Sequence, residues 1–206
     1  MARRNDLCTG VPPDGHTLFS NAWAMLQQTD GNGYAQIGYE RHTPGAVLEF
    51  FAAFKKYTGA SQVLNHFTDQ GPNLGTAYRF KVTWKDGANE DNQIHLILCD
   101  AGGGNCRDHT PAALGWNPSS AGWGGSAAAW AGEVNDHTSD IPGLDTKPAT
   151  FNAIQIRNHS GGWYVPSSID ECRQEGGSGC SDSYYAYHWQ STSSSTFEIW
   201  TKPIAR

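Results

Sequence analysis

The chain of 206 residues contains few charged side chains and no long apolar run. Charged residues make up 17% of it, and no stretch approaches the roughly 18 consecutive apolar residues of a membrane-spanning helix. Lys and Arg number 14 against 20 Asp and Glu, so the net charge is −6 and a basic face for nucleic acid or an anionic membrane is missing. We therefore expect neither nucleic acid nor a membrane among its partners.

Several short catalytic motifs are absent as well. The serine-nucleophile pattern GxSxG does not occur, because Gly124-Gly125-Ser126 lacks the second glycine. No HExxH or CxxC pattern is present, and the spacing of thiols and histidines fits no zinc site. Asp136, His137 and Asp140 offer a candidate cation site, although solvated loop histidines are the more usual interpretation. We expect no metal and no cofactor.

Cysteine is also scarce, with five residues in the chain. Cys99 and Cys106 enclose one glycine-rich stretch, and Cys172 and Cys180 enclose another. This pattern predicts two short disulfide loops on strand connections, with Cys8 left unpaired, and a metal site is the alternative. Because disulfides persist in oxidising compartments, we expect a secreted protein.

The N-terminal segment does not read as a signal peptide, because no apolar stretch follows its basic residues. If the protein is exported, the signal peptide is missing from this sequence, and residues 1–15 are expected to be flexible or extended. The whole chain, 1–206, is expected to form a single domain and a monomer, since all-β folds of this size are routinely one unit.

Glycine and aromatic residues are what the chain has in abundance, with 24 Gly and eight each of Trp, Tyr and Phe. Residues 78–84 alternate apolar and polar side chains, a period of two that predicts a half-buried strand. Similar stretches bounded by turn residues predict further strands at 20–27, 34–40, 47–54, 62–67, 93–98, 128–135, 150–157, 162–165, 184–189 and 196–201. The fold class is therefore all-β, a two-sheet antiparallel β-sandwich.

One segment allows two interpretations, and two others are expected to be irregular. Leu48, Phe51 and Phe54 fall at helical spacing, so a helix over 47–57 competes with the strand. The strand is preferred because of the adjacent phenylalanines and the flanking glycines. Residues 112–129 contain a proline and many small residues and are expected to form a loop, and 191–196 a turn.

Three polar side chains stand out on the predicted strands. Gln36 and Glu40, with Gly38 between them, share one face of their strand, which indicates a face lining a wet groove. Glu133 lies beside Trp130 in a small, apolar stretch, where partial desolvation would suit a general acid or base. The alternatives are a salt bridge or loop cap for Glu133 and an ordinary sheet-surface position for Gln36.

These residues resemble a known family. The run 22–25 and, after a glycine-rich turn, Gln36-Ile37-Gly38 resemble the AWVGIDG and LQTG segments of the eqolisin-type glutamic peptidases, where the glutamine is catalytic. Residues 130–134 lie where that family carries its catalytic glutamate, and they are close to the WGGEV motif of the neprosin-type prolyl peptidases. Residues 110–118 and 141–143 are similar to the neprosin segments before and after that glutamate.

The resemblance implies a concanavalin-like jelly roll in which two catalytic side chains project from neighbouring strands of a concave sheet. Glu133 would activate water as general base and then protonate the leaving amine, and Gln36 would orient the water and stabilise the oxyanion. A neprosin-type pair would need two glutamates, for which Glu40 is the candidate. Trp23 and Trp130 are possible supporting residues.

Two functions from different classes remain open. The first is a secreted, acid-active glutamic endopeptidase that acts on peptides or proteins. Ala52-Ala53 occupy the place of an acidic residue of the family, so a homologue without peptidase activity is an alternative to the active enzyme. The second is a carbohydrate-binding module, in which aromatic side chains such as Trp116, Trp123, Trp163 or Tyr184-Tyr185 stack on sugars from the same concave sheet. Burial of these aromatics in the core, or a surface domain without a small ligand, are the plainer readings.

Overall fold

The computed structural model describes residues 19–28, 33–43, 47–56, 60–67, 71–73, 75–84, 94–110, 126–134, 142–144, 146–157, 162–166, 185–191 and 195–202. These residues form strands and their connections, and the secondary structure among them is all β. No helix that is long and apolar enough to cross a membrane occurs in this part of the chain. The predictions for residues 1–15, Cys8, 112–125 with Trp116 and Trp123, 136–140, Cys172, Cys180 and Tyr184 lie outside the described residues.

The chain divides into two compact units. Unit 2 comprises residues 22–42 and 47–131, and unit 1 comprises residues 1–21, 43–46 and 132–206. The boundary falls inside two of the strands. The single-domain organisation stays a prediction.

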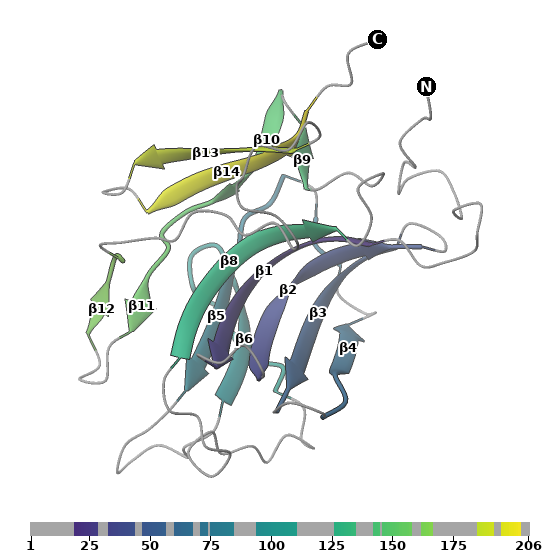
Figure 1. Cartoon of the computed structure of the whole chain (residues 1–206), viewed down its shortest axis with the longest axis vertical. Helices are drawn as coiled ribbons and strands as arrows, with labels where there is room; N and C mark the ends of the chain where they lie inside the picture. The colour runs from purple at the N-terminus through teal and green to yellow at the C-terminus, as the bar shows by residue number, and fades with distance from the viewer. Residues whose placement is uncertain are drawn as a thin grey trace. The chain divides into compact units, whose positions relative to one another are not determined.

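A five-stranded sheet dominates unit 2, and Figure 1 shows its strands side by side. The sheet order is β4-β3-β2-β1-β8. The strands are β1 (Phe19–Gln28), β2 (Tyr34–His42), β3 (Val47–Lys55), β4 (Val63–Phe67) and β8 (Ser126–Val134). The antiparallel register of β2 and β3 pairs Gln36 with Ala53 and Glu40 with Glu49.

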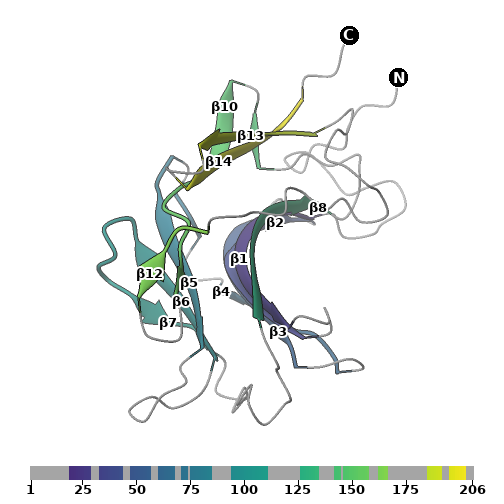
Figure 2. The ribbon, with the colours of Figure 1, turned by 60° about the vertical axis from the view of Figure 1, so that its left-hand side comes forward.

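A second sheet packs against the first and completes the sandwich. It consists of β5 (Tyr78–Trp84), β6 (Ile94–Asp100) and β7 (Arg107–Asp108). Apolar side chains from both sheets form one core, among them Ile37 and Phe50 from the first sheet and Leu96 and Phe80 from the second. Figure 2 shows that the five-stranded sheet is curved, with β5 and β6 on its convex side. We call the opposite side the concave face.

Unit 1 holds a four-stranded and a two-stranded sheet. The four-stranded sheet has the order β10-β9-β14-β13, with β9 (Gly143–Leu144), β10 (Lys147–Phe151), β13 (Tyr185–Ser191) and β14 (Thr196–Thr201). Strand β9 pairs parallel to β14, and Phe151 stacks on Phe197 with ring centroids 4.5 Å apart. The other sheet pairs β11 (Ile156–Arg157) with β12 (Trp163–Tyr164).

Most of the predicted strands are confirmed. Residues 47–55 form a strand rather than a helix, since alternate side chains reach the two faces of a sheet. The prediction of one strand over 150–157 is wrong, because Ala153 has a φ of 53° and the chain changes sheet there. The loop predicted over 112–129 is wrong at its end, where Ser126 begins β8, and the short strands β7 and β9 were not predicted.

Candidate functional site

The concave face carries the polar residues that the sequence placed on one side of β2. Ala35 and Ile37 point into the sandwich core, so the alternation of the strand turns Gln36 and Glu40 to the other side. The shared face is therefore confirmed, but the expectation of a wet groove is wrong. Gln36 is 9% exposed and Glu40 is 7% exposed.

Apolar residues lie around Gln36 on this face. Trp23, Phe51 and Ala53 form a buried cluster on the concave face, and Met25, Ala129 and Ala131 pack against it. Ala53 is the direct cross-strand partner of Gln36. The side-chain amide of Gln36 thus belongs to a face that the neighbouring strands cover with apolar groups, where a polar group interacts more strongly than in water.

Trp23 and Trp130 occupy different sides of the sheet. Trp23 is buried in the concave cluster, in the same sheet as Gln36. Trp130 lies between Ala129 and Ala131 on β8, and because those two alanines pack in the concave cluster, Trp130 points to the opposite side of its strand. A supporting role on the concave face therefore fits Trp23 better than Trp130.

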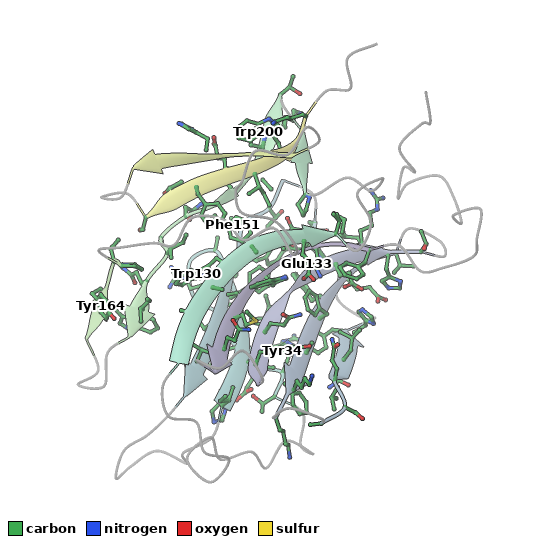
Figure 3. All side chains as sticks on the ribbon, in the orientation of Figure 1. Tyr34, Trp130, Glu133, Phe151, Tyr164 and Trp200 are labelled. Atoms are coloured by element: carbon green, nitrogen blue, oxygen red, sulfur yellow. A yellow bond between two sulfur atoms is a disulfide. The ribbon has the colours of Figure 1, made fainter. Side chains whose placement is uncertain are left out.

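Glu133 lies near the end of β8, three residues after Trp130, and both side chains are labelled in Figure 3. Its side chain is exposed, so the expected partial desolvation is wrong. The preceding Gly132 has a packing reason, because an added Cβ would overlap Cδ1 of Ile199 in unit 1.

The pairing of Gln36 with Glu133 stays a prediction, because the two residues belong to different units. The expectation that they project from neighbouring strands is wrong. In the sheet order, β1 lies between β2, which carries Gln36, and β8, which carries Glu133. The strand order follows pairings between distant parts of the chain, which the local sequence pattern does not encode.

Glu40 lies in a group of polar residues that the sequence analysis missed. His66 Nε2 lies 3.1 Å from Glu40 Oε1, and His42 Nε2 lies 3.3 Å from Glu49 Oε2. The two imidazole rings stack with their centroids 4.8 Å apart. Among the described residues, Glu40, His42 and His66 form a group whose potential metal-ligand atoms all lie within 4.8 Å of one another.

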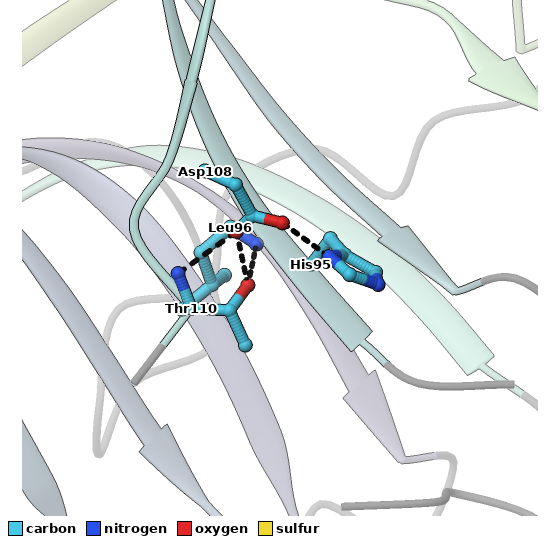
Figure 4. Close-up of polar contacts among 4 residues, drawn as sticks. All are labelled: His95, Leu96, Asp108 and Thr110. Atoms are coloured by element: carbon cyan, nitrogen blue, oxygen red, sulfur yellow. Dashed lines mark hydrogen bonds and ion pairs between the residues drawn. The ribbon is translucent and has the colours of Figure 1, made fainter. Parts of the chain in front are cut away.

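A second polar network lies on the three-stranded sheet and is drawn in Figure 4. The carboxylate of Asp108 on β7 contacts Nδ1 of His95 on β6 and accepts hydrogen bonds from the backbone N–H, at 2.9 Å, and hydroxyl of Thr110. The Thr110 hydroxyl oxygen accepts from the backbone N–H of Leu96 at 3.0 Å. Burial raises the pKa of Asp108, but the Thr110 and His95 hydrogen bonds and the His95 charge together outweigh it and leave the pKa below its ordinary value. This network fastens β7 to β6.

The first of the two predicted disulfides is confirmed, since Cys99 and Cys106 are bonded across the β6–β7 connection. Asp100 organises the enclosed loop, because its carboxylate accepts hydrogen bonds from the backbone N–H of Gly104 at 2.8 Å and from Asn105 Nδ2 at 3.0 Å. The loop therefore has an internal framework besides the covalent link.

The comparisons with known proteins agree with this architecture. The crystal structure of aspergilloglutamic peptidase from Aspergillus niger is similar to the chain, with a TM-score of 0.52 over 89% of this chain and 98% of that one. The chain has a glutamic peptidase-like fold. The two sequences are 13% identical, so the likeness concerns the fold alone. No protein-family model matches the sequence, and no curated protein is detectably similar to it.

Proposed function

We propose that the protein is a secreted, acid-active glutamic endopeptidase that hydrolyses peptide bonds with Gln36 and Glu133. One observation supports this above others: a glutamine occupies the concave face of a sheet with a glutamic peptidase-like fold. The alternation of β8 adds support, because it gives Glu133 the same side of its strand as Ala129 and Ala131, which pack in the concave cluster.

The proposed mechanism uses two side chains and one water. The carboxylate of Glu133 removes a proton from the water as its oxygen bonds to the peptide carbon. The amide N–H of Gln36 donates to the oxyanion that develops on the carbonyl oxygen. The C–N bond then breaks, and the proton on Glu133 passes to the leaving amine. The exposed Glu133 is accessible to water, as a general base in hydrolysis has to be.

Two further features belong to this proposal. The Cys99–Cys106 disulfide supports an oxidising, extracellular location. The substrate is a peptide or protein. The enzyme itself acts as a monomer. Glu40 is the candidate second acid of a neprosin-type pair, but its short contact with His66 favours a different role for it.

The test is cleavage of a mixed peptide library between about pH 2.5 and 7, read by mass spectrometry, by the parent protein and Glu133→Gln. Loss of a general base typically costs about 10²–10⁴ in rate, so we expect the variant to fold and to lose nearly all turnover. Gln36→Ala should lose about 10²–10³, the cost of one oxyanion donor. Glu198→Gln is the matched control, because Glu198 lies on β14 and should not affect turnover. A Glu133→Gln variant as active as its parent would contradict the assignment of Gln36 and Glu133 as the catalytic pair.

A carbohydrate-binding role is the second candidate, favoured by one observation. Trp163 and Tyr164 on β12 are 51% and 46% exposed, and adjacent exposed aromatic rings can stack on sugars. They lie in the two-stranded sheet, so the expectation that Trp163 binds from the concave sheet is wrong. This function would be supported if the folded parent protein cleaves no peptide but binds glycans on an array. The Trp163→Ala variant should then lose that binding.

A further inference from the structure

We propose that Glu40, His42, Glu49 and His66 form a binding site for a divalent transition-metal ion, with zinc as the preferred ion. This inference goes beyond the proposed peptidase function and does not depend on it. The four side chains come from β2, β3 and β4, three neighbouring strands of one sheet within unit 2. We call them the His–Glu cluster.

The register of the strands brings the cluster together. Glu40 and His42 are two residues apart on β2 and share its concave side, and Glu49 on β3 is directly opposite Glu40. His66 on β4 is directly opposite Phe51, a member of the concave cluster, so it faces the same side. Two imidazoles and two carboxylates thus meet on one face although they are spread over 27 residues of sequence.

The distances suit ligands of one ion. Two ligands in a tetrahedral zinc site are about 3.3 Å apart, since zinc–nitrogen and zinc–oxygen distances are about 2.0–2.2 Å. The separations are 3.1 Å between His66 Nε2 and Glu40 Oε1, and 3.3 Å between His42 Nε2 and Glu49 Oε2. The ligand atoms of Glu40, His42 and His66 lie within 4.8 Å of one another, which places the three side chains around one position, and Glu49 adjoins them through His42.

Charge is the second argument for a cation. Glu40 and Glu49 are directly opposed on adjacent strands and are 7% and 8% exposed, and like charges in that arrangement destabilise a sheet. A divalent ion bound between the two carboxylates would balance their charge.

The donor types point to zinc. Magnesium and calcium take oxygen ligands, whereas two imidazole nitrogens select a borderline transition ion. Zinc accepts a mixed set of imidazole and carboxylate ligands in tetrahedral geometry. Each histidine would bind through Nε2 and carry its proton on Nδ1, so acid should compete with the metal for Nε2.

The first test is a titration of the whole, chelator-treated protein with Co²⁺ at about pH 7.5, followed by displacement with Zn²⁺. We expect one Co²⁺ per chain, with the visible absorption of a tetrahedral site, and a thermal midpoint that Zn²⁺ raises. Both signals should vanish in acid. The proposal is overturned if the folded protein shows no Co²⁺ absorption and no Zn²⁺-dependent shift of its thermal midpoint at millimolar metal.

Variants locate the site. His66→Gln and His42→Gln should each weaken Co²⁺ binding by at least about 10-fold, because each removes a ligand. His188→Gln is the matched control, because His188 lies 4.0 Å from Glu198, outside the His–Glu cluster, and its side chain is 63% exposed. Equal Co²⁺ affinities for His66→Gln and His188→Gln would place the metal elsewhere and reject the cluster.

An independent measurement covers the case in which the histidine variants do not fold. X-ray absorption of the zinc-loaded parent should show imidazole nitrogen and carboxylate oxygen at about 2.0–2.2 Å. A sulfur ligand at about 2.3 Å would instead assign the metal to cysteine and overturn the proposal. Neither experiment depends on peptidase activity, so the failure of one proposal leaves the other to its own test.

Discussion

At the scale of single residues, burial decides the behaviour of the polar groups in the sandwich. Tyr39 on β2 packs against the core between the two sheets, and burial raises the pKa of its hydroxyl from 10.0 to about 12. The same strand turns Gln36 and Glu40 toward the concave face. One strand therefore supplies both a core residue and the candidate site.

The raised pKa of Tyr39 predicts a loss of stability in alkali. Between pH 10 and 12 the unfolded chain ionises this tyrosine while the folded chain keeps it neutral, so stability falls as pH rises through this window. A pKa raised from 10.0 to about 12 corresponds to about 2–3 kcal/mol of stability. Denaturant unfolding at pH 9 and above should show this loss in the parent and not in Tyr39→Phe. Parallel pH curves for the two proteins would contradict the assignment.

Gly38 has a steric reason to be glycine. An added Cβ would overlap the carbonyl oxygen of Ala22 and lie 2.8 Å from the Cα of Trp23 on β1. Gly38→Ala should therefore cost about 3 kcal/mol or more of the free energy of unfolding, by forcing β1 and β2 apart. Gly102→Ala is the matched control, because its nearest neighbour would be Asp100 Oδ1 at 3.6 Å. Similar urea midpoints for both variants would show that the strands do not approach so closely.

At the scale of elements, the short strand β7 depends on a disulfide and on side-chain hydrogen bonds for its position. Strand β7 consists of two residues, Arg107 and Asp108, and it pairs with Ile97 and Leu98 of β6. The Cys99–Cys106 disulfide ties the residue before β7 to β6, and the Asp108 network ties the last residue of β7 to β6. A strand this short has too few ladder hydrogen bonds to hold its place alone.

The Asp108 network predicts a pH-dependent contribution to stability. Because folding lowers the pKa of Asp108, its stabilisation is present above the unfolded pKa, near 3.8, and is lost as pH falls through the lower folded pKa. The side chain is 42% exposed, so we expect Asp108→Asn to cost about 1 kcal/mol or less at pH 7. Thermal unfolding should show this gap closing below about pH 3.8. A gap that is constant with pH would mean that the charge contributes nothing.

At the scale of the whole molecule, the main sheet is built from distant parts of the chain. Strand β1 ends at Gln28 and β8 begins at Ser126, yet the two are neighbours in the sheet order. To form such a pairing, the chain must lose the entropy of closing a long loop before the strand contacts can stabilise it.

This topology predicts slow folding. The main refolding phase should take milliseconds to seconds, as in other sandwiches dominated by non-local pairing, and should not complete in microseconds. Stopped-flow refolding after a brief unfolding pulse measures this phase, because the pulse is too short for prolines to isomerise. Full recovery of the signal within the dead time would contradict the prediction.

The sequence by itself determined the all-β class, most strands and the Cys99–Cys106 disulfide, because alternation, turn residues and short cysteine spacing are local signals. It also placed Gln36 and Glu40 on one face of their strand. Only the tertiary structure decided that this face is buried, that β1 separates β2 from β8, and that Glu40 meets His66. These features depend on strand order and register, which are fixed by contacts between residues far apart in the chain. A His–Glu cluster drawn from three strands therefore leaves no spacing motif that sequence reading can find.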